Sequence, residues 1–223
     1  MWCLQVKKID VFALKGYNES SKTGGVFMNK KYLITISRQY GSGGREVGKR
    51  LAELLGVPFY DKELIEKIAE ETGFSQKFIE EYGEHAPGTN VFSYSFLGRD
   101  ANGISMQDKI WMQQRKLILD LAEKEPCVIV GRCADYILRN RTDCLNVFIH
   151  ASTEKKVERI VKLYGETADK PEKRLADKDK KRRVNYRYYT DREWGAAQNY
   201  HLCLDSGEFG IEGCADLIAD LAK

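Results

Sequence analysis

The chain has 223 residues, a length that fits one domain with a small insertion. Hydrophobic residues make up 43% of it and charged residues 31%, but the net charge is only +3, so no overall field favours a nucleic-acid or membrane partner. No apolar run is long enough to span a bilayer, and none of the six cysteines forms a C-x-x-C pair. Buried thiols in a reducing cytosol are the simplest interpretation, ahead of a metal site or disulfides, so we expect a cytoplasmic protein.

Residues 1–27 differ from the rest of the chain. Lys7, Lys8 and Asp10 break their apolar runs and no small-residue cleavage site follows, so they do not form a signal peptide. Met28 precedes NKKYLITIS, a natural start for a first core strand. Our hypothesis is that translation starts at Met28. Residues 1–27 would then be an extension foreign to the native protein, and residues 28–223 a single domain. Mass spectrometry of the native protein tests this.

Residues 32–56 predict a strand, a glycine-rich turn and a helix. Residues 33–36 are a short β-branched run typical of a buried strand. The turn that follows contains Gly41, Ser42, Gly43 and Gly44, and apolar residues then recur at helical spacing until Gly56, a typical helix-ending glycine. The N–H groups of such a turn and the helix dipole together favour an anion. The sequence therefore predicts a phosphate site; the alternative is a turn that only allows close helix–sheet packing.

The turn matches neither common phosphate-binding pattern in full. G-x-G-x-x-G fails because Glu46 stands at the third glycine. The Walker pattern G-x-x-x-x-G-K-[ST] has a near match ending at Lys49 and Arg50, but that register places the loop well past the strand. In the better register, Arg38 takes the first glycine, Gly43 the second, Gly44 the lysine and Arg45 the Ser/Thr. The backbone cradle remains, whereas the lysine and the hydroxyl are gone. Arg45 is a candidate for the missing positive charge, and Ser42 or Glu46 could approach a metal.

Four segments in order resemble the cytidylate kinase-like proteins, which are relatives of the bacterial cytidylate kinases among the P-loop nucleoside monophosphate kinases. They are ITISRQYGSGGREVGKRLAELLG, VPFYDKELIEKIAEETG, VIVGRCADYIL and NYHLCLDSGEFG. The resemblance runs from about residue 31 to the C-terminus. It implies an α/β protein with a three-layer α/β/α P-loop kinase fold, a five-stranded parallel sheet and a helical lid. Loss of the Walker lysine is typical of this subgroup, so the resemblance indicates family membership more strongly than kinase activity.

Beyond the first helix, predicted strands and helices alternate, and no run requires an antiparallel hairpin. This alternation implies right-handed crossovers and a parallel sheet. The predicted strands cover residues 57–60, 127–130, 145–149 and 200–204. The predicted helices cover residues 62–71, 75–82, 104–124, 152–164 and 211–222. Three of them end at a glycine or proline: Gly73, Pro126 and Gly165.

The region of about residues 61–124 holds the acceptor monophosphate in this kinase class, and Asp61 stands at its start. Within it, residues 85–103 are rich in Gly, Ser, Asn and aromatic residues and predict a long functional loop. Its aromatic residues Phe92, Tyr94 and Phe96 either stack on a base or pack on one side of an irregular strand.

Arg132 follows the buried strand over residues 127–130, at the end where parallel sheets bind ligands. By the resemblance, Arg132 contacts the acceptor monophosphate; an ordinary salt bridge is the alternative. Val130 and Cys133 stand where the family has acidic neighbours, which leaves base recognition open. Asp135 is a candidate to compensate.

Residues 166–192 interrupt the alternation with clustered basic residues and tyrosines. Pro171 can begin a helix here, and Lys178 and Arg182 would then share a face. Phosphoryl transfer needs positive charge around the transferring group, so we interpret this segment as a lid. By the resemblance Arg182 is the leading phosphate contact, followed by Arg183 and Lys178. A solvated charged face and RNA binding are the alternatives.

The sequence thus predicts a nucleoside monophosphate kinase for CMP, dCMP or a related monophosphate, with ATP and Mg²⁺ implied by the resemblance. The alternative is a nucleotide- or phosphate-binding protein without kinase turnover. We expect small-molecule nucleotides as partners, no membrane and no nucleic acid, and leave a homodimer open. The candidate catalytic residues are Arg45, Arg132 and Arg182. The candidate phosphate- or nucleotide-binding residues are Arg38, Gly41, Ser42, Gly43, Gly44, Arg45, Glu46, Lys178 and Arg183. The candidate acceptor-binding residues are Asp61, Arg132 and Asp135.

Overall fold

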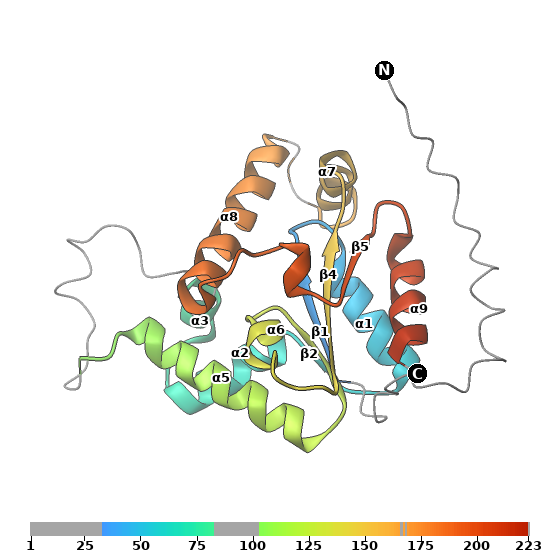
Figure 1. Cartoon of the computed structure of the whole chain (residues 1–223). Coiled ribbons are helices and arrows are strands. Elements are labelled where there is room, and N and C mark those ends of the chain that lie inside the picture. The colour runs from blue at the N-terminus through green and yellow to red at the C-terminus, as the bar shows by residue number, and fades with distance from the viewer. Residues whose placement is uncertain (1–32, 83–102, 166, 168, 223) are drawn as a thin grey trace, which may run out of the picture.

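The computed structural model describes residues 33–82, 103–165, 167 and 169–222 (Figure 1). The hypothesis about residues 1–27 therefore lies outside the described residues. The same holds for almost all of the loop predicted at residues 85–103, with its aromatic residues Phe92, Tyr94 and Phe96. The base-stacking interpretation of these aromatic residues stays a prediction.

A five-stranded sheet forms the centre of the described structure, with the strand order β2-β3-β1-β4-β5. Every neighbouring pair is parallel, so the predicted parallel sheet is confirmed. The central strand is β1, and the chain therefore leaves β1 in the middle of the carboxyl edge of the sheet. The strands are β1 (Leu33–Arg38), β2 (Phe59–Tyr60), β3 (Cys127–Val130), β4 (Cys144–His150) and β5 (Leu202–Asp205).

Helices cover both faces of this sheet, which gives the three-layer α/β/α architecture (Figure 1). Successive side chains of a strand point to opposite faces. Leu33 of β1 accordingly belongs to one hydrophobic cluster and Ile34 to the other. The Leu33 side is covered by α2 (Lys62–Thr72), α3 (Gln76–Tyr82), α5 (Met106–Lys124) and α6 (Ala134–Ile137). The Ile34 side is covered by α1 (Gly44–Leu55) and α9 (Gly210–Ala222).

Two further helices, α7 (Thr153–Lys162) and α8 (Pro171–Thr190), lie between β4 and β5 in the chain, and a 3-10 turn, η2 (Ala197–Asn199), precedes β5. Helix α8 begins with the proline that the sequence suggested, so its predicted helical structure is confirmed. Its buried Leu175 lies next to the glycine turn, and its Tyr189 stacks on Trp111 of α5 at 4.3 Å between ring centroids. Helix α8 therefore spans the carboxyl edge of the sheet from the turn to α5.

Element boundaries differ from the sequence predictions by one or two residues. The last strand begins at Leu202 rather than residue 200, because Tyr200 still closes the turn η2 through its N–H bond to the Ala197 carbonyl. The helix predicted from residue 104 begins at Met106, because the Ser105 hydroxyl accepts from the Asp108 N–H and acts as the N-cap.

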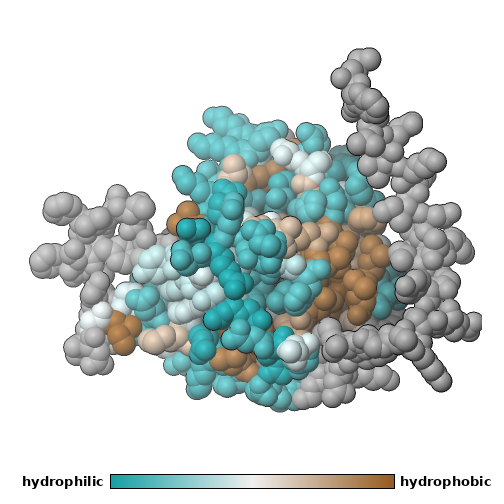
Figure 2. Space-filling model, in the orientation of Figure 1, coloured by the Kyte–Doolittle hydropathy of each residue, from teal (hydrophilic) through white to brown (hydrophobic). Residues whose placement is uncertain are grey.

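The molecular surface is unevenly polar. On the face shown in Figure 2, hydrophobic side chains gather over α9, whereas α8 presents mostly hydrophilic ones. Among the described helices, none is both long and apolar enough to cross a membrane.

Candidate functional site

The glycine turn connects β1 to α1 at the middle of the carboxyl edge of the sheet. Gly41 and Gly43 both have φ of +75°, a backbone conformation that side chains disfavour. Gly43 is the N-cap of α1, and no side chain of residues 33–82, 103–165 or 169–222 caps the first turn of that helix. The helix therefore begins with backbone N–H groups that a side chain does not satisfy, at the positive end of its dipole. This geometry suits an anion.

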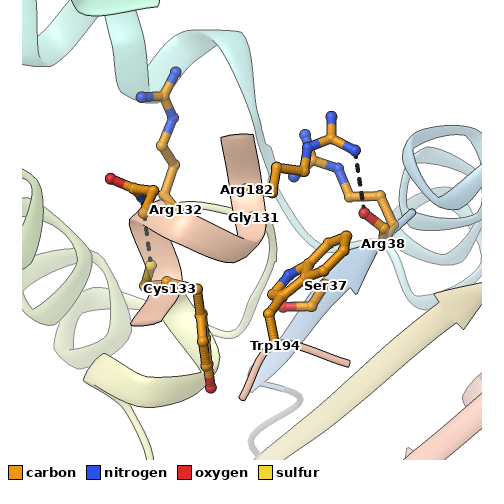
Figure 3. Close-up of a pocket in the computed structure, with 9 residues that line it drawn as sticks. Ser37, Arg38, Gly131, Arg132, Cys133, Arg182 and Trp194 are labelled. Atoms are coloured by element: carbon orange, nitrogen blue, oxygen red, sulfur yellow. Dashed lines mark hydrogen bonds between the residues drawn. The ribbon is translucent and has the colours of Figure 1, made fainter. Parts of the chain in front are cut away.

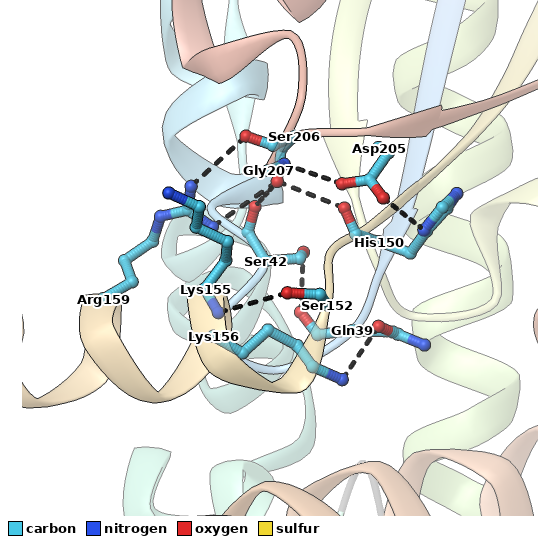
Figure 4. A network of polar contacts seen from close by, with 10 residues as sticks. All are labelled: Gln39, Ser42, His150, Ser152, Lys155, Lys156, Arg159, Asp205, Ser206 and Gly207. Atoms are coloured by element: carbon cyan, nitrogen blue, oxygen red, sulfur yellow. Dashed lines mark hydrogen bonds and ion pairs between the residues drawn. The ribbon is translucent and has the colours of Figure 1, made fainter. Parts of the chain in front are cut away.

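Side chains on the side of α7 and β5 hold the turn in place (Figure 4). Arg159 Nη1 donates to the Gly41 carbonyl at 2.9 Å, and the Ser206 hydroxyl donates to the Ser42 carbonyl. The Ser42 hydroxyl in turn donates to the Gln39 carbonyl at 2.8 Å. Carbonyl oxygens of the turn are thus bound from the side of α7 and β5, which keeps these negative dipoles away from the opposite side of the turn.

A cleft of about 240 Å³ lies beside the turn. Most of the predicted phosphate-binding residues line it, together with Tyr164, which sequence reasoning did not select. The lining residues are Arg38, Gln39, Tyr40, Gly41, Gly43, Gly44, Arg45, Glu46, Tyr164 and Arg182. Ser42 is not among them, because it is fully buried behind the turn.

Arg45 and Glu46 are among the lining residues whose side chains have partners. Arg45 Nε lies 2.5 Å from Asp61 Oδ2, and this hydrogen bond is the main reason that the pKa of Arg45 is raised. The Arg45 side chain is 49% exposed, so the pair lies at the rim of the cleft. The Glu46 carboxylate accepts a hydrogen bond from the Tyr164 hydroxyl at 3.1 Å.

A second, smaller cavity of about 30 Å³ lies at the carboxyl ends of β1 and β3 (Figure 3). Figure 3 shows Arg38 and Arg182 on one side of it and Arg132 on the other. Arg182 Nη1 donates to the Arg38 carbonyl at 3.2 Å. The complete lining is Ser37, Arg38, Gly131, Arg132, Cys133, Arg182, Asn185, Tyr186 and Trp194.

Arg132 is in an unusual environment for a charged side chain. It is 8% exposed, and its Nη1 has no hydrogen-bond partner among the described residues. Its backbone has φ of +56°, held in part by Gln114 Nε2, which donates to the Arg132 carbonyl at 2.9 Å. Asn185 Oδ1 on the same cavity is also buried, and it too has no partner in the described part of the chain. Unsatisfied buried polar groups are costly, and a ligand that pairs with them would remove the cost.

Asp135 lies beneath this cavity rather than on its wall. Its carboxylate accepts hydrogen bonds from the Tyr186 hydroxyl at 2.7 Å and from the Ser37 hydroxyl at 3.2 Å. Burial raises the pKa of Asp135 above its usual value, although both hydrogen bonds act in the opposite direction. Asp135 therefore links α6, α8 and β1 below the residues that line the cavity.

Helix α8 contacts the turn through both basic and acidic side chains. The Lys178 ammonium and the Arg182 guanidinium lie 5.7 and 5.6 Å from the centre of the Tyr40 ring. Asp179 accepts the Tyr40 N–H at 2.7 Å, whereas Arg183 is exposed on the outer side of the helix. Sequence reasoning missed Asp179 and Asn185. Only their burial distinguishes them from the polar residues around them, and burial depends on which side of α8 packs against the domain.

The described residues contain no cluster of three or more His, Cys, Asp or Glu side chains that could hold a metal ion. Ser42 and Glu46, the groups that could approach a metal, are both engaged in the hydrogen bonds given above.

A glycine turn between the first strand and helix of a parallel sheet, with arginines above it, defines the fold class of the P-loop kinases. The chain matches the cytidylate kinase-like family over residues 33–208, most of its length, and belongs to that family. No curated protein matches the sequence.

Solved structures have the same fold. An uncharacterised protein from Eubacterium ventriosum is 26% identical, with a TM-score of 0.65, over 85% of this chain and 97% of that one. A shikimate kinase from Acinetobacter baumannii, in complex with shikimate, is 19% identical with a TM-score of 0.50, over 86% and 93%. A gluconokinase from Sinorhizobium meliloti is 18% identical with a TM-score of 0.52, over 86% and 94%. The kinase structures support the fold alone.

Proposed function

We propose that the protein transfers the γ-phosphate of ATP to a nucleoside monophosphate, with CMP or dCMP as the acceptors that family membership favours. One observation carries the proposal. Arg38 and Arg182 line both the cleft beside the glycine turn and the cavity beside Arg132. Positive charge therefore lies between a place suited to donor phosphates and a place suited to an acceptor phosphate.

The donor phosphates would lie on the glycine turn. The uncapped start of α1 supplies backbone N–H groups and a positive dipole end. The described residues do not fit a magnesium ion held by the protein at the Walker position, because Arg45 replaces the Ser/Thr hydroxyl that would bind the ion. We therefore assign no step to a protein-held metal.

The acceptor phosphate would lie against Arg132. A buried guanidinium nitrogen that has no partner among the described residues gains most from a negatively charged oxygen, and arginine pairs with phosphate in bidentate fashion. Asn185 Oδ1 offers an acceptor to a neighbouring hydroxyl or amino group of the same ligand. Asp135 would position Tyr186 and Ser37 below this ligand.

The proposed reaction needs positioning and charge rather than a covalent intermediate. Phosphoryl transfer spreads negative charge over the equatorial oxygens of the moving group, and arginines stabilise that charge. Arg182 comes from α8, so its contribution depends on α8 remaining docked on the turn. An arginine in this role elsewhere contributes about 10³–10⁵ in rate.

A coupled assay of ADP release with each nucleoside monophosphate tests the proposal. We expect turnover with at least one monophosphate, highest with CMP or dCMP. Arg132→Ala should lower kcat/KM for the acceptor by about 10²–10⁴, because it removes a charged contact to the acceptor phosphate. The matched control is Arg50→Ala, since Arg50 lies on the exposed side of α1 and pairs with Glu212.

The binding-only alternative is supported by a specific observation, the absence of a side chain at position 44, where the Walker lysine belongs. ATP or CMP binding without turnover of any monophosphate would favour it. Steep salt dependence of RNA affinity would instead support RNA binding by the exposed basic side of α8.

A further inference from the structure

We infer that Arg38 replaces the missing Walker lysine: its side chain occupies the space that a lysine at position 44 would need, and it brings a positive charge to the same transferring phosphate. The inference rests on the proposed function and names a catalytic residue for it. It differs from the sequence-based candidate for this charge, Arg45.

Side chains at positions 38 and 44 exclude each other. A Cβ atom added to Gly44 would lie 2.4 Å from Arg38 Cβ and 3.0 Å from Arg38 Cγ. Real Cβ atoms essentially never approach another heavy atom closer than 3.0 Å. The Walker pattern has glycine at the first of these positions and lysine at the second, and this chain has the reverse arrangement. The positive side chain therefore comes from the end of β1 in this protein, and not from the start of α1 as in the Walker pattern.

The Arg38 side chain ends beside the cavity that we propose for the acceptor phosphate. Its Cβ and Cγ pass Gly44, and its Nη1 lies beside Gly131, where an added Cβ would come within 2.2 Å. Gly131 follows β3, the neighbour of β1 in the sheet. The Arg38 side chain therefore runs from the glycine turn towards the acceptor-side cavity, and it lines both spaces. Gly44 and Gly131 are the two glycines that leave room for this path.

Arg45 is less suited to the same task. Its guanidinium is paired with the Asp61 carboxylate at 2.5 Å and is half exposed, so its charge is balanced and partly screened. Arginine at position 38 also offers several N–H donors in a planar fork, which can contact two phosphate oxygens at once.

The step that Arg38 would assist is balanced without any further reactant. An oxygen of the acceptor monophosphate forms a bond to the γ-phosphorus of ATP. The bond from that phosphorus to the bridging oxygen breaks, and its electron pair stays on the ADP formed. Arg38 would stabilise the negative charge on the oxygens of the moving group, as the Walker lysine does in other enzymes.

An exchange of the two side chains provides the sharpest test. Arg38→Gly should lower kcat by about 10²–10³ if one charge contact to the transition state is lost. Adding Gly44→Lys to Arg38→Gly recreates G-x-x-x-x-G-K and should recover at least tenfold of that loss. Gly44→Lys alone should not be active, because its Cβ meets Arg38. Circular dichroism and thermal melting show that each variant is folded, and Arg50→Ala is the matched control.

Two conservative substitutions of Arg38 test the inference if the exchange variants fail to fold. Arg38→Met preserves the packing across Gly44 without the charge, and Arg38→Lys preserves both. We expect Arg38→Lys to exceed Arg38→Met at least tenfold in kcat, and ATP affinity measured by calorimetry to fall at least threefold in Arg38→Met. Equal kcat values and unchanged ATP affinity in the two folded variants would overturn the inference. Wild-type protein that binds ATP without turnover would overturn the proposed function instead, and the ATP affinities would still report on Arg38.

Discussion

The Asp179 carboxylate accepts the backbone N–H of Tyr40 at 2.7 Å, so an acidic side chain of α8 occupies a backbone donor in the glycine turn. Asp179 is only 6% exposed. Burial raises its pKa, whereas the Tyr40 N–H and the charges of Arg182 and Lys156 act to lower it. This carboxylate binds the start of the turn, one residue before the predicted phosphate site, and its charge opposes the arrival of another anion nearby.

We therefore predict that Asp179→Asn strengthens ATP binding by about three- to tenfold, which corresponds to roughly 1 kcal/mol of relieved repulsion. Asparagine can still accept the Tyr40 N–H, so the docking of α8 should persist. Isothermal titration calorimetry at low and moderate salt measures the effect. The gain should shrink as the pH falls through the raised pKa of Asp179, because the wild-type carboxyl then loses its charge. Weaker ATP binding by the folded variant would show that Asp179 supports the nucleotide instead.

Because Asp135 is buried, we predict that the free energy of unfolding of the protein depends on pH. Its pKa in the folded protein lies above the ordinary value of 3.8, so between these two pKa values the folded state holds a proton that the unfolded state releases. The stability cost of its charge is thus absent below about pH 3.8 and is fully present above the raised pKa. Relative to wild type, Asp135→Asn should become progressively more stable as the pH rises through that window. Urea unfolding at several pH values measures this difference, and a difference independent of pH would contradict it.

Tyr186→Phe tests the Asp135 carboxylate by removing one of its hydrogen-bond donors. The variant removes the hydroxyl that donates to Asp135 at 2.7 Å. Hydrogen bonds to charged groups contribute about 1.5–3 kcal/mol, so we expect a loss of that size in the free energy of unfolding at a pH above the raised pKa of Asp135, where its carboxylate is charged. The loss should diminish at low pH, where Asp135 is protonated in both proteins. Tyr188→Phe is a suitable control because Tyr188 is exposed.

Local sequence patterns were sufficient for most of the fold. Residue types alone predicted the conformation of three features. These are the apolar strand β1, the glycine turn and the left-handed glycine at residue 56. Pro171 likewise marked the start of α8. Side-chain direction was not predictable in this way. The path of Arg38 across Gly44 depends on how β1 and α1 meet, and the burial of Asp179 within a highly charged segment depends on which side of α8 packs. The candidate site therefore required coordinates, although most of the residues that line the cleft had been selected from the sequence.

The stacked rings of Trp111 and Tyr189 connect α5 to α8, with centroids 4.3 Å apart and an angle of 10° between the rings. We expect Trp111→Ala to lower the free energy of unfolding by about 2–4 kcal/mol, since a large, partly buried ring is lost. A double-mutant cycle with Tyr189→Ala should give a coupling of about 0.5–1.5 kcal/mol. Met112→Ala is the matched control, because Met112 neighbours Trp111 but is 50% exposed. A coupling near zero would show that the stack does not hold α8 in place.

The buried cysteines predict a selective reaction with thiol reagents. Burial raises the pKa of Cys127 and of Cys144 to about 12, and that of Cys214 to about 11. At pH 8 their thiolate fractions are therefore on the order of 10⁻³ to 10⁻⁴, and burial blocks access as well. Cys203 is partly exposed and should react first among the cysteines that the structure describes.

The measurement is a time course with Ellman's reagent in a Cys3→Ser background, because Cys3 lies outside the described residues. We expect one fast thiol in the native protein, which disappears in Cys203→Ser, and rapid reaction of all remaining thiols after denaturation. Raising the pH from 7 to 9 should accelerate the native reaction at Cys203 and leave the buried thiols slow. Fast labelling of Cys127 or Cys144 in the native state would mean that the sheet opens locally, since both side chains lie beneath α5 and α6 in the same hydrophobic cluster.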